Sequence, residues 1–330
     1  MHNTWIRRLG PLLAIALTLA ATACGGSSDK KASATPFNDN PTAITGVKTA
    51  PAFPLTVKRS DGAALTISQP AKKIVSMSPG ATEILYAIGA QDALVAVDKN
   101  ADYPDGAKNF PTKIDAYEPN IEAVAALSPD LVILPGDNGG ILAKLDGLKI
   151  PVLYQDLDKD VRTIDDVLGQ IALLGQITGH GGNAQKLVQS LSKRVDAVKQ
   201  AMQGVPSQST PSVYHELDAT YYTASTGTFI GSLYEILHMR NIAKDGGGVA
   251  YPQLTQEAII AGNPGVIVLA DEAYGVTVES VKGRPGWSAI DAVAKDKIIA
   301  IDPNLISRPG PRIVDALEEL ARKIYPTRFQ

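Results

Sequence analysis

The sequence predicts an α/β protein built from two Rossmann-like lobes with parallel sheets, joined by a single long interlobe helix. From Lys73 onward, short apolar runs alternate with helical patterns, which is typical of a parallel sheet covered by helices. The alternation stops between residues 163 and 204 and then resumes. Several segments of the first half also return, in the same order, in the second half.

The repeated segments favour two versions of one α/β unit. "NIEAVAALSPDLVIL", from Asn120, matches "TQEAIIAGNPGVIVL", from Thr255, at five positions that include a glutamate near the start. "KIPVLYQD" is echoed by "KIIAIDPN", and "ILYAIGA" by "SLYEILH". Any one pair fits chance similarity between generic α/β units, but three pairs in register favour a common architecture.

Each lobe is expected to contain the following elements. The antiparallel hairpin signal "LTVKRSDGAALTIS", with Asp61-Gly62 at its turn, precedes the first lobe. Strands are predicted at Ile74–Ser76, Leu94–Val97, Leu131–Leu134, Val152–Tyr154, Val213–Leu217, Val266–Leu269 and Ile298–Ile301. Helices are predicted at Ala81–Ile88, Ile121–Leu127, Ile141–Leu148, Ile230–Leu237, Gln256–Ala261 and Arg312–Ile324.

The middle of the chain is predicted to be helical throughout. Ile164–Ile177 and Asn183–Met202 have no strand between them, and the second carries apolar residues at steps of three and four. A helix of that length spans about 30 Å, enough to bridge two lobes.

The first residues have the pattern of a secretory signal peptide. Arg7 and Arg8 precede an apolar run that is too short to span a bilayer stably, and small residues follow. The sole cysteine, Cys24, stands at the expected cleavage site, which favours a lipid-modified N-terminus over plain secretion. The predicted domains are a signal peptide (1–23), a flexible tether (24–54), an N-terminal lobe with its hairpin (55–162), a helical linker (163–204) and a C-terminal lobe (205–330).

Composition argues against several classes of protein. The net charge of −3 does not suggest a nucleic-acid-binding protein, and one cysteine permits no internal disulfide. No two of the four histidines have metal-ligand spacing, and neither G-x-S-x-G nor a phosphate-binding loop occurs. We therefore predict a binding protein with no catalytic residues, no metal site of its own and no cofactor.

A ligand is expected beyond the carboxyl ends of the strands, because that is where open parallel sheets bind small molecules. Tyrosines, amides and an arginine in these loops suit a large amphipathic ligand. Each also has a structural interpretation: Ser78 as a helix cap, Asp137 as a turn residue, and Arg308 as part of a salt bridge. The candidate ligand contacts are Ser78, Asn100, Tyr117, Asp137, Tyr221, Tyr222, Tyr274 and Arg308.

Five segments give the chain a resemblance to a known family. They are "KIVSMSPGATEILYAIGAQDALVAVD", "DYP", "NIEAVAALSPDLVIL", "YPQLTQEAII" and "SRPGPRIVDALEELA". Together they resemble the substrate-binding lipoproteins of ABC importers for ferric siderophores, haem and cobalamin, the class III periplasmic binding proteins with a helical backbone. The resemblance implies an extracytoplasmic, lipid-anchored receptor, monomeric, that delivers its ligand to a permease dimer with its ATPase.

The resemblance also implies a role for the repeated glutamates. Glu122 and Glu257 stand at the family positions that dock on arginines of the permease. Each follows a helix cap by two residues, so the helix dipole also favours it there without any partner.

The ligand itself stays open at this stage. The motifs are most similar to the cobalamin-binding branch, but Asn100, Ala116 and Pro135 replace aromatic pocket residues of that branch. A ferric siderophore is the alternative, and haem is a weaker one. A receptor that feeds a membrane sensor and a metal-cluster oxidoreductase component are the rivals from other classes.

Overall fold

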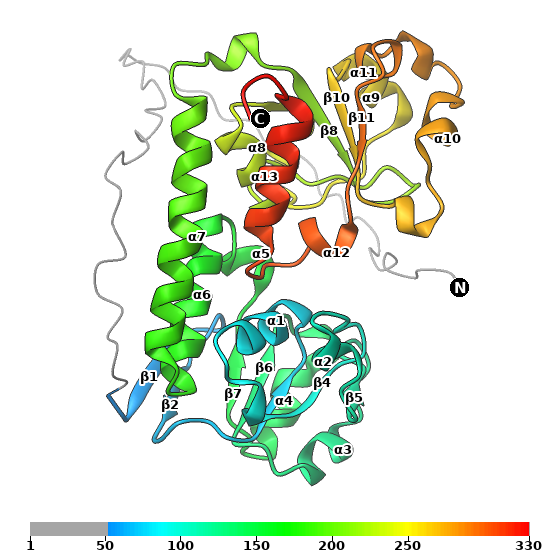
Figure 1. Ribbon diagram of the computed structural model, residues 1–330. Coiled ribbons are helices and arrows are strands. Elements are labelled where there is room, and N and C mark those ends of the chain that lie inside the picture. The colour runs from blue at the N-terminus through cyan, green and yellow to red at the C-terminus, as the bar shows by residue number, and fades with distance from the viewer. Residues whose placement is uncertain (1–51, 330) are drawn as a thin grey trace, which may run out of the picture. The chain divides into compact units, whose positions relative to one another are not determined.

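The computed structural model describes residues 52–329, which form one compact unit (Figure 1). The predicted signal peptide, Cys24 and nearly all of the tether lie outside the described residues. The hairpin is present as β1 (Leu55–Lys58) and β2 (Ala64–Ile67), paired antiparallel. Gly62 occupies the turn with φ 91°, a backbone conformation that glycine adopts without strain.

The first lobe has a five-stranded parallel sheet in the order β5-β4-β3-β6-β7. Strands β3 and β6 are buried along their full length, as expected for strands covered on both faces. The strands are β3 (Ile74–Ser76), β4 (Leu94–Asp98), β5 (Lys113–Ile114), β6 (Leu131–Leu134) and β7 (Val152–Tyr154). The helices are α1 (Pro79–Ala87), α2 (Asp105–Lys108), α3 (Ile121–Ala126), α4 (Ile141–Gly147) and α5 (Leu157–Asp160).

The second lobe has a four-stranded parallel sheet in the order β11-β10-β8-β9. Read from β9, this order repeats β4-β3-β6-β7 of the first lobe, so the duplication predicted from the repeated segments is present in the topology. The strands are β8 (Ser212–Glu216), β9 (Arg240–Asn241), β10 (Val266–Leu269) and β11 (Ile298–Ala300). The helices are α8 (Phe229–Ile236), α9 (Gln256–Gly262), α10 (Val278–Lys282), α11 (Asp291–Ala294), α12 (Pro303–Ile306) and α13 (Ile313–Ile324).

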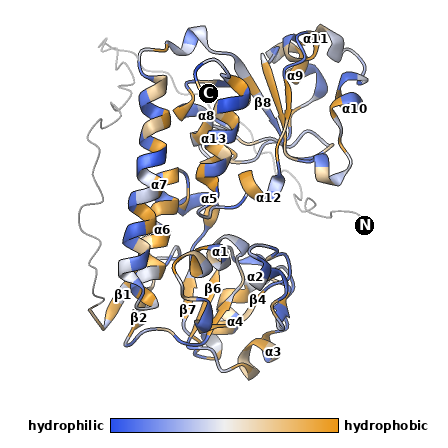
Figure 2. Ribbon diagram, in the orientation of Figure 1, coloured by the Kyte–Doolittle hydropathy of each residue, from blue (hydrophilic) through white to orange (hydrophobic). Residues whose placement is uncertain are grey.

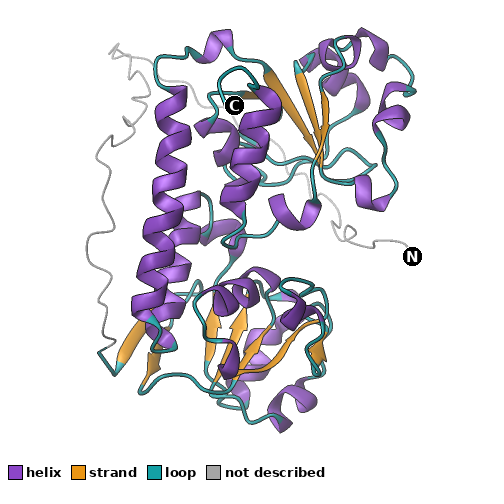
Figure 3. Cartoon of the chain, viewed as in Figure 1, coloured by secondary structure: helices purple, strands orange, loops and turns teal. Residues whose placement is uncertain are grey.

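Two helices, α6 (Ile164–Ile177) and α7 (Gly181–Met202), connect the lobes and pack along one another (Figures 1 and 3). Thr163 and Asp166 form a capping box at the start of α6, which satisfies backbone N–H groups that the helix leaves unpaired. Helix α7 begins two residues earlier than predicted, directly after the turn at Gly179 (φ 79°) and His180. Its exposed face is polar, and its buried stripe runs from Ala184 to Met202 (Figure 2).

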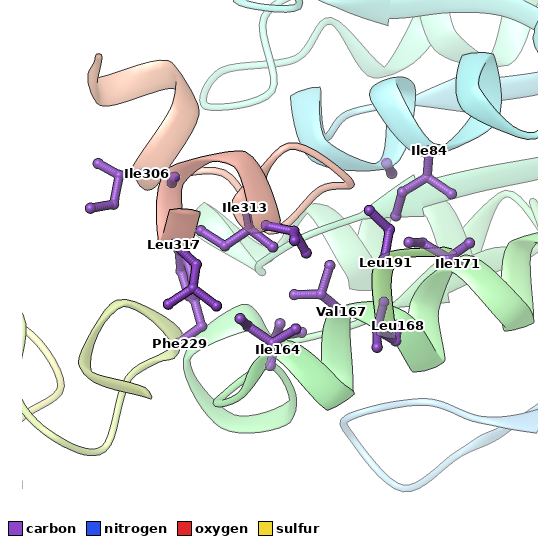
Figure 4. Close-up of a cluster of buried hydrophobic side chains, with 14 of the residues drawn as sticks. Ile84, Ile164, Val167, Leu168, Ile171, Leu191, Phe229, Ile306, Ile313 and Leu317 are labelled. Carbon is purple, nitrogen blue, oxygen red and sulfur yellow. The ribbon is translucent and has the colours of Figure 1, made fainter. Parts of the chain in front are cut away.

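One hydrophobic cluster is shared by both lobes and the connecting helices. Figure 4 shows Ile84 of α1, Ile171 of α6 and Leu191 of α7 together with Phe229 and Ile313 of the second lobe. Each large aliphatic side chain buried here contributes about 1.5–3 kcal/mol. The lobes are therefore held by a continuous core, reinforced where Asn183 of α7 donates a 2.9 Å hydrogen bond to the carbonyl of Ile88.

The structure adds elements that the sequence did not predict. Strands β5 and β9 each comprise two residues at a sheet edge, too short to produce an alternating pattern. The short helices α2, α5, α10, α11 and α12 lie in segments rich in turn residues. The exact domain boundaries given above stay a prediction.

Candidate functional site

A polar joint connects loops that follow the carboxyl ends of strands in the two lobes. On α1 of the first lobe, Glu83 accepts hydrogen bonds from Arg312 of the second lobe at 2.9 and 2.6 Å. Asp102, in the loop after β4, binds Arg308 at 2.5 and 3.2 Å. Asn304 binds both Asp102 (2.9 Å) and Arg308 (2.8 Å). We call these five residues the cross-lobe joint.

The two ion pairs of the joint differ in depth. The Glu83 side chain is 2% exposed, whereas that of Asp102 is 42% exposed. Burial alone would raise the pKa of Asp102, but its hydrogen bond to Arg308 and the positive charges of Arg308 and Arg312 together hold that pKa below its usual value. The joint thus has a buried Glu83–Arg312 pair and a solvent-accessible Asp102–Arg308 pair at its rim.

Glycines allow the two lobes to meet backbone to backbone at the joint. A Cβ on Gly80, in the first turn of α1, would lie 2.7 Å from the carbonyl oxygen of Pro309. A Cβ on Gly310 would lie 3.3 Å from a Glu83 carboxylate oxygen. The "SPG" and "RPG" motifs of the sequence therefore face each other across the lobe boundary, and each uses its glycine for close approach.

A second charged cluster is buried inside the second lobe. Glu216, the last residue of β8, accepts two hydrogen bonds from Arg284 at 2.6 and 2.5 Å. The guanidinium of Arg284 lies over the rings of Trp287 (4.5 Å) and Tyr221 (5.2 Å). Asp271 is fully buried, and neither of its carboxylate oxygens has a hydrogen-bond partner among the described residues.

Burial and the neighbouring negative charge of Glu216 raise the pKa of Asp271 to about 7. An unpaired buried carboxylate costs much free energy, so Asp271 is most stable as the neutral acid near Glu216. Glu216 is paired with Arg284. Through Arg284 and Trp287, this cluster contacts the ring of Tyr221, which is one of the predicted ligand contacts.

A cavity of about 410 Å³ lies at the carboxyl ends of β10 and β11. Three of its lining residues are acids, and Lys323 pairs with one of them, Glu319, at 2.6 Å. The lining residues are Glu272, Ala273, Ala300, Ile301, Asp302, Pro303 and Glu319. None of the eight predicted ligand contacts lines this cavity.

The structure brings two of the predicted ligand contacts together: Arg308 donates a 3.0 Å hydrogen bond to the carbonyl of Asn100. Ser78 caps α1 through a 3.2 Å bond from the Ala81 amide, and Asp137 accepts one from the Leu142 amide at 2.9 Å. These are the helix-cap and turn roles that the sequence also allowed. Their roles as ligand contacts stay a prediction.

The four predicted tyrosines are spread over both lobes. Tyr117 and Tyr274 are 56% and 75% exposed, in the loops after β5 and β10. Tyr221 has a positive φ of 70°, packs on Trp287 at 5.9 Å and reaches Gln256 at 3.3 Å. Tyr222 is half-buried and forms a β-bridge with Gln253. His215, whose imidazole is of the type that can ligate haem iron, is fully buried, and its Nδ1 lies 2.6 Å from the hydroxyl of Tyr234.

Glu122 and Glu257 occupy matching places in the two lobes. Both are exposed residues in the first turns of α3 and α9, whose caps are Asn120 and Thr255. Each helix leads into the central part of its sheet, to β6 and β10 respectively. The chain therefore presents one acid from each lobe at equivalent helix starts.

Sequence reasoning missed Glu83, Asp102 and Arg312. The signal for Glu83 was present, because a glutamate in "GATEILYAI" lies among residues that are otherwise apolar or small. Its partner could not be inferred, since Arg312 is far along the chain. Among residues 52–329 there is no group of three or more His, Cys, Asp or Glu side chains arranged to hold a metal ion.

The family model described as "Periplasmic binding protein" matches residues 74–305, which span both lobes and the connecting helices. The chain belongs to the periplasmic binding protein family. An uncharacterised ABC transporter substrate-binding lipoprotein, YvrC of Bacillus subtilis, is 34% identical over 84% of this chain and 88% of its own length. These findings confirm the predicted fold and the predicted role as a solute-binding component of an ABC transporter.

Two solved structures of periplasmic binding proteins share the fold. The vitamin B12 binding protein BtuF of Vibrio cholerae has a TM-score of 0.67 and 28% identity, covering 79% of this chain and 99% of that one. A possible iron-binding periplasmic protein of Staphylococcus epidermidis has a TM-score of 0.65 and 29% identity, covering 78% and 100%. The two relatives differ in named ligand, so they do not favour cobalamin over an iron chelate.

As a periplasmic binding protein the chain acts outside the cytoplasmic membrane. Over residues 52–329 the structure contains no helix that is both long and apolar enough to cross a membrane.

Proposed function

We propose that this periplasmic binding protein captures a metal-chelate nutrient between its lobes and delivers it to an ABC permease dimer with its ATPase. The observation that carries the proposal is the cross-lobe joint, where loops from the carboxyl ends of both sheets meet around Arg308. Ligands of open parallel sheets bind at this edge, and pockets favour the interface of two lobes.

A corrinoid is the first candidate ligand, and a ferric siderophore is the second. The vitamin B12 binding protein of Vibrio cholerae supports the first and the possible iron-binding protein of Staphylococcus epidermidis supports the second. Haem is the weakest candidate, because the buried ring of His215 is not accessible and Tyr221 packs against Trp287. The chain performs no chemistry on its ligand in this proposal.

The exposed glutamates Glu122 and Glu257 are proposed to dock on the permease. A two-fold partner requires one contact from each lobe, and equivalent helix starts provide them. The acyl-modified Cys24 is proposed to hold the monomeric receptor at the membrane surface, with the predicted tether as a flexible connection. A receptor that feeds a membrane sensor would use the same glutamates but would support no uptake.

Ligand binding to the intact protein tests the proposal directly. The protein is mixed with cyanocobalamin, ferrichrome, ferrioxamine B or haemin, and its melting temperature is followed. A ligand at 100 times its dissociation constant stabilises the folded state by about 2.7 kcal/mol, a shift that is easily measured. If none of these chelates changes the melting temperature, the proposed function is wrong.

A further inference from the structure

The guanidinium of Arg308 is already engaged within the protein. Asp102 binds it with both carboxylate oxygens, Asn304 accepts a further hydrogen bond, and the Glu83 carboxylate lies 3.6 Å away. The Arg308 side chain is only 12% exposed. An anionic ligand group would have to separate Arg308 from Asp102 before it could make the same contact.

We propose that Asp102 is a specificity-determining residue that makes the ligand site favour uncharged or cationic chelates over polyanionic ones. The inference rests on the proposed function and narrows its ligand class. By cancelling the charge of Arg308, Asp102 removes the attraction that a polyanion would need. Corrinoids and ferric hydroxamates fit this class, whereas ferric tricatecholates and haem, with its two propionates, do not.

The other buried arginines near the carboxyl ends of the strands are also paired with carboxylates. Arg312 pairs with Glu83 and Arg284 with Glu216, so the buried guanidinium groups carry no excess charge. Among the lysines, Lys99 pairs with Asp115, and Lys113 donates to two backbone carbonyls. Lys244, in the loop after edge strand β9, forms no ion pair with another described residue.

Near the carboxyl ends of the strands, several carboxylates have no ion-pair partner among the described residues. Glu272 and Asp302 line the cavity beside β10 and β11, and neither forms an ion pair among the described residues. Asp137, after β6, is exposed and uses its carboxylate to accept a backbone N–H. A ligand with several negative charges would meet these carboxylates, whereas Arg308, Arg312 and Arg284 are each already bound by a carboxylate. Repulsion between like charges disfavours the binding of such a ligand.

The isosteric substitution Asp102→Asn tests the inference. It keeps the shape of the side chain and one of the two oxygen acceptors that Arg308 uses, but it removes the negative charge that compensates the guanidinium. The matched control is Asp315→Asn, since Asp315 is also a half-exposed aspartate bound to an arginine, Arg194, at 2.6 Å. Asp315 lies on α13, outside the loops that follow the strands.

Dissociation constants are measured for cyanocobalamin, ferrioxamine B, haemin and ferric enterobactin, at low and at physiological salt. In the unmodified protein, cyanocobalamin or ferrioxamine B should bind more tightly than the two anionic chelates. Asp102→Asn should shift the ratio of the two dissociation constants in favour of ferric enterobactin over cyanocobalamin by about tenfold at low salt, and by less at high salt. Asp315→Asn should change none of these ratios.

Arg308→Gln provides a variant with the opposite expectation. It removes the positive charge that compensates Asp102, so the preference for the cation ferrioxamine B over ferric enterobactin should increase. If the unmodified protein bound ferric enterobactin most tightly of the four chelates, the proposed role of Asp102 would be wrong. Equal effects of Asp102→Asn and Asp315→Asn would contradict that role as well. Neither result would contradict the proposed function. Failure of all four probes to bind would instead overturn the proposed function and this inference with it.

Discussion

Arg312 and Glu83 form a bidentate ion pair across the lobe boundary, with hydrogen bonds of 2.9 and 2.6 Å. The Arg312 guanidinium also lies over the ring of Tyr103, with 3.9 Å between its central carbon and the ring centroid. Each lobe supplies one charge, so neither charge is compensated unless the lobes are in contact. The pair therefore links the stability of the fold to the geometry of the joint.

Removing one charge of this pair should destabilise the protein strongly. Glu83→Gln leaves the mostly buried Arg312 without a negative partner, and breaking a buried pair in this way costs about 3–5 kcal/mol. Urea unfolding measures the change in the free energy of unfolding. Lys295→Gln, which removes an exposed i,i+4 pair with Asp291, is the control and should cost about 0.5 kcal/mol or less. Equal effects would contradict a structural role for the buried pair.

Adding a methyl group at Gly80 should disturb the contact between the lobes. The new Cβ would lie 2.7 Å from the backbone oxygen of Pro309, so the loop has to move, at a cost of about 1–3 kcal/mol. Gly169→Ala, on the exposed face of α6, meets no atom within 4 Å and should stabilise by about 0.5–1 kcal/mol. Thermal unfolding measures both. A neutral Gly80→Ala would show that the loop yields freely.

The stability of the protein should fall as the pH rises toward neutrality, because of Asp271. Its folded-state pKa is raised to about 7 by burial and by Glu216, so the folded protein holds a proton that the unfolded chain releases. The stabilisation is complete below the ordinary carboxyl pKa and is lost as the pH rises through about 7, a change on the order of 2–4 kcal/mol. Urea unfolding from pH 5 to pH 8 measures it.

The variant Asp271→Asn should remove this pH dependence. An amide carries no negative charge beside Glu216 at any pH, so the variant should exceed the unmodified protein in stability at pH 8. In a Trp5→Phe background, Trp287 is the one tryptophan left, and its emission should titrate near pH 7 only when Asp271 is present. Asp165→Asn, an exposed first-turn aspartate of α6, serves as the control. A titration that survives in Asp271→Asn would assign the proton to another group.

Replacing both proposed docking acids should separate ligand capture from transport. The double variant Glu122→Ala/Glu257→Ala should bind ligand as the unmodified protein does, because both side chains are exposed at helix starts away from the cross-lobe joint. Uptake into vesicles that contain the permease should fall to background. Glu279→Ala, an exposed first-turn acid of α10, should transport normally. Normal uptake by the double variant would remove the docking assignment.

Local patterns were sufficient to predict most of the elements. Strands β3, β6, β7 and β10 were predicted with their observed limits, because each is a short apolar run bounded by polar or turn residues. The cap residues Asn120 and Thr255 likewise located α3 and α9. Edge strands such as β5 were not predictable, because two residues held by neighbouring hydrogen bonds have no periodicity of their own.

The sequence by itself determined the α/β class, the duplication, the bridging helix and the family, because these depend on periodicity and on motifs that are local in the chain. Only the tertiary structure decided that Arg308 is bound by Asp102, that Arg312 pairs with Glu83, and that Asp271 lies unpaired beside Glu216. These relationships join residues from different elements, and in most cases from different lobes. Their energies depend on distance and burial, which arise only when the chain has folded.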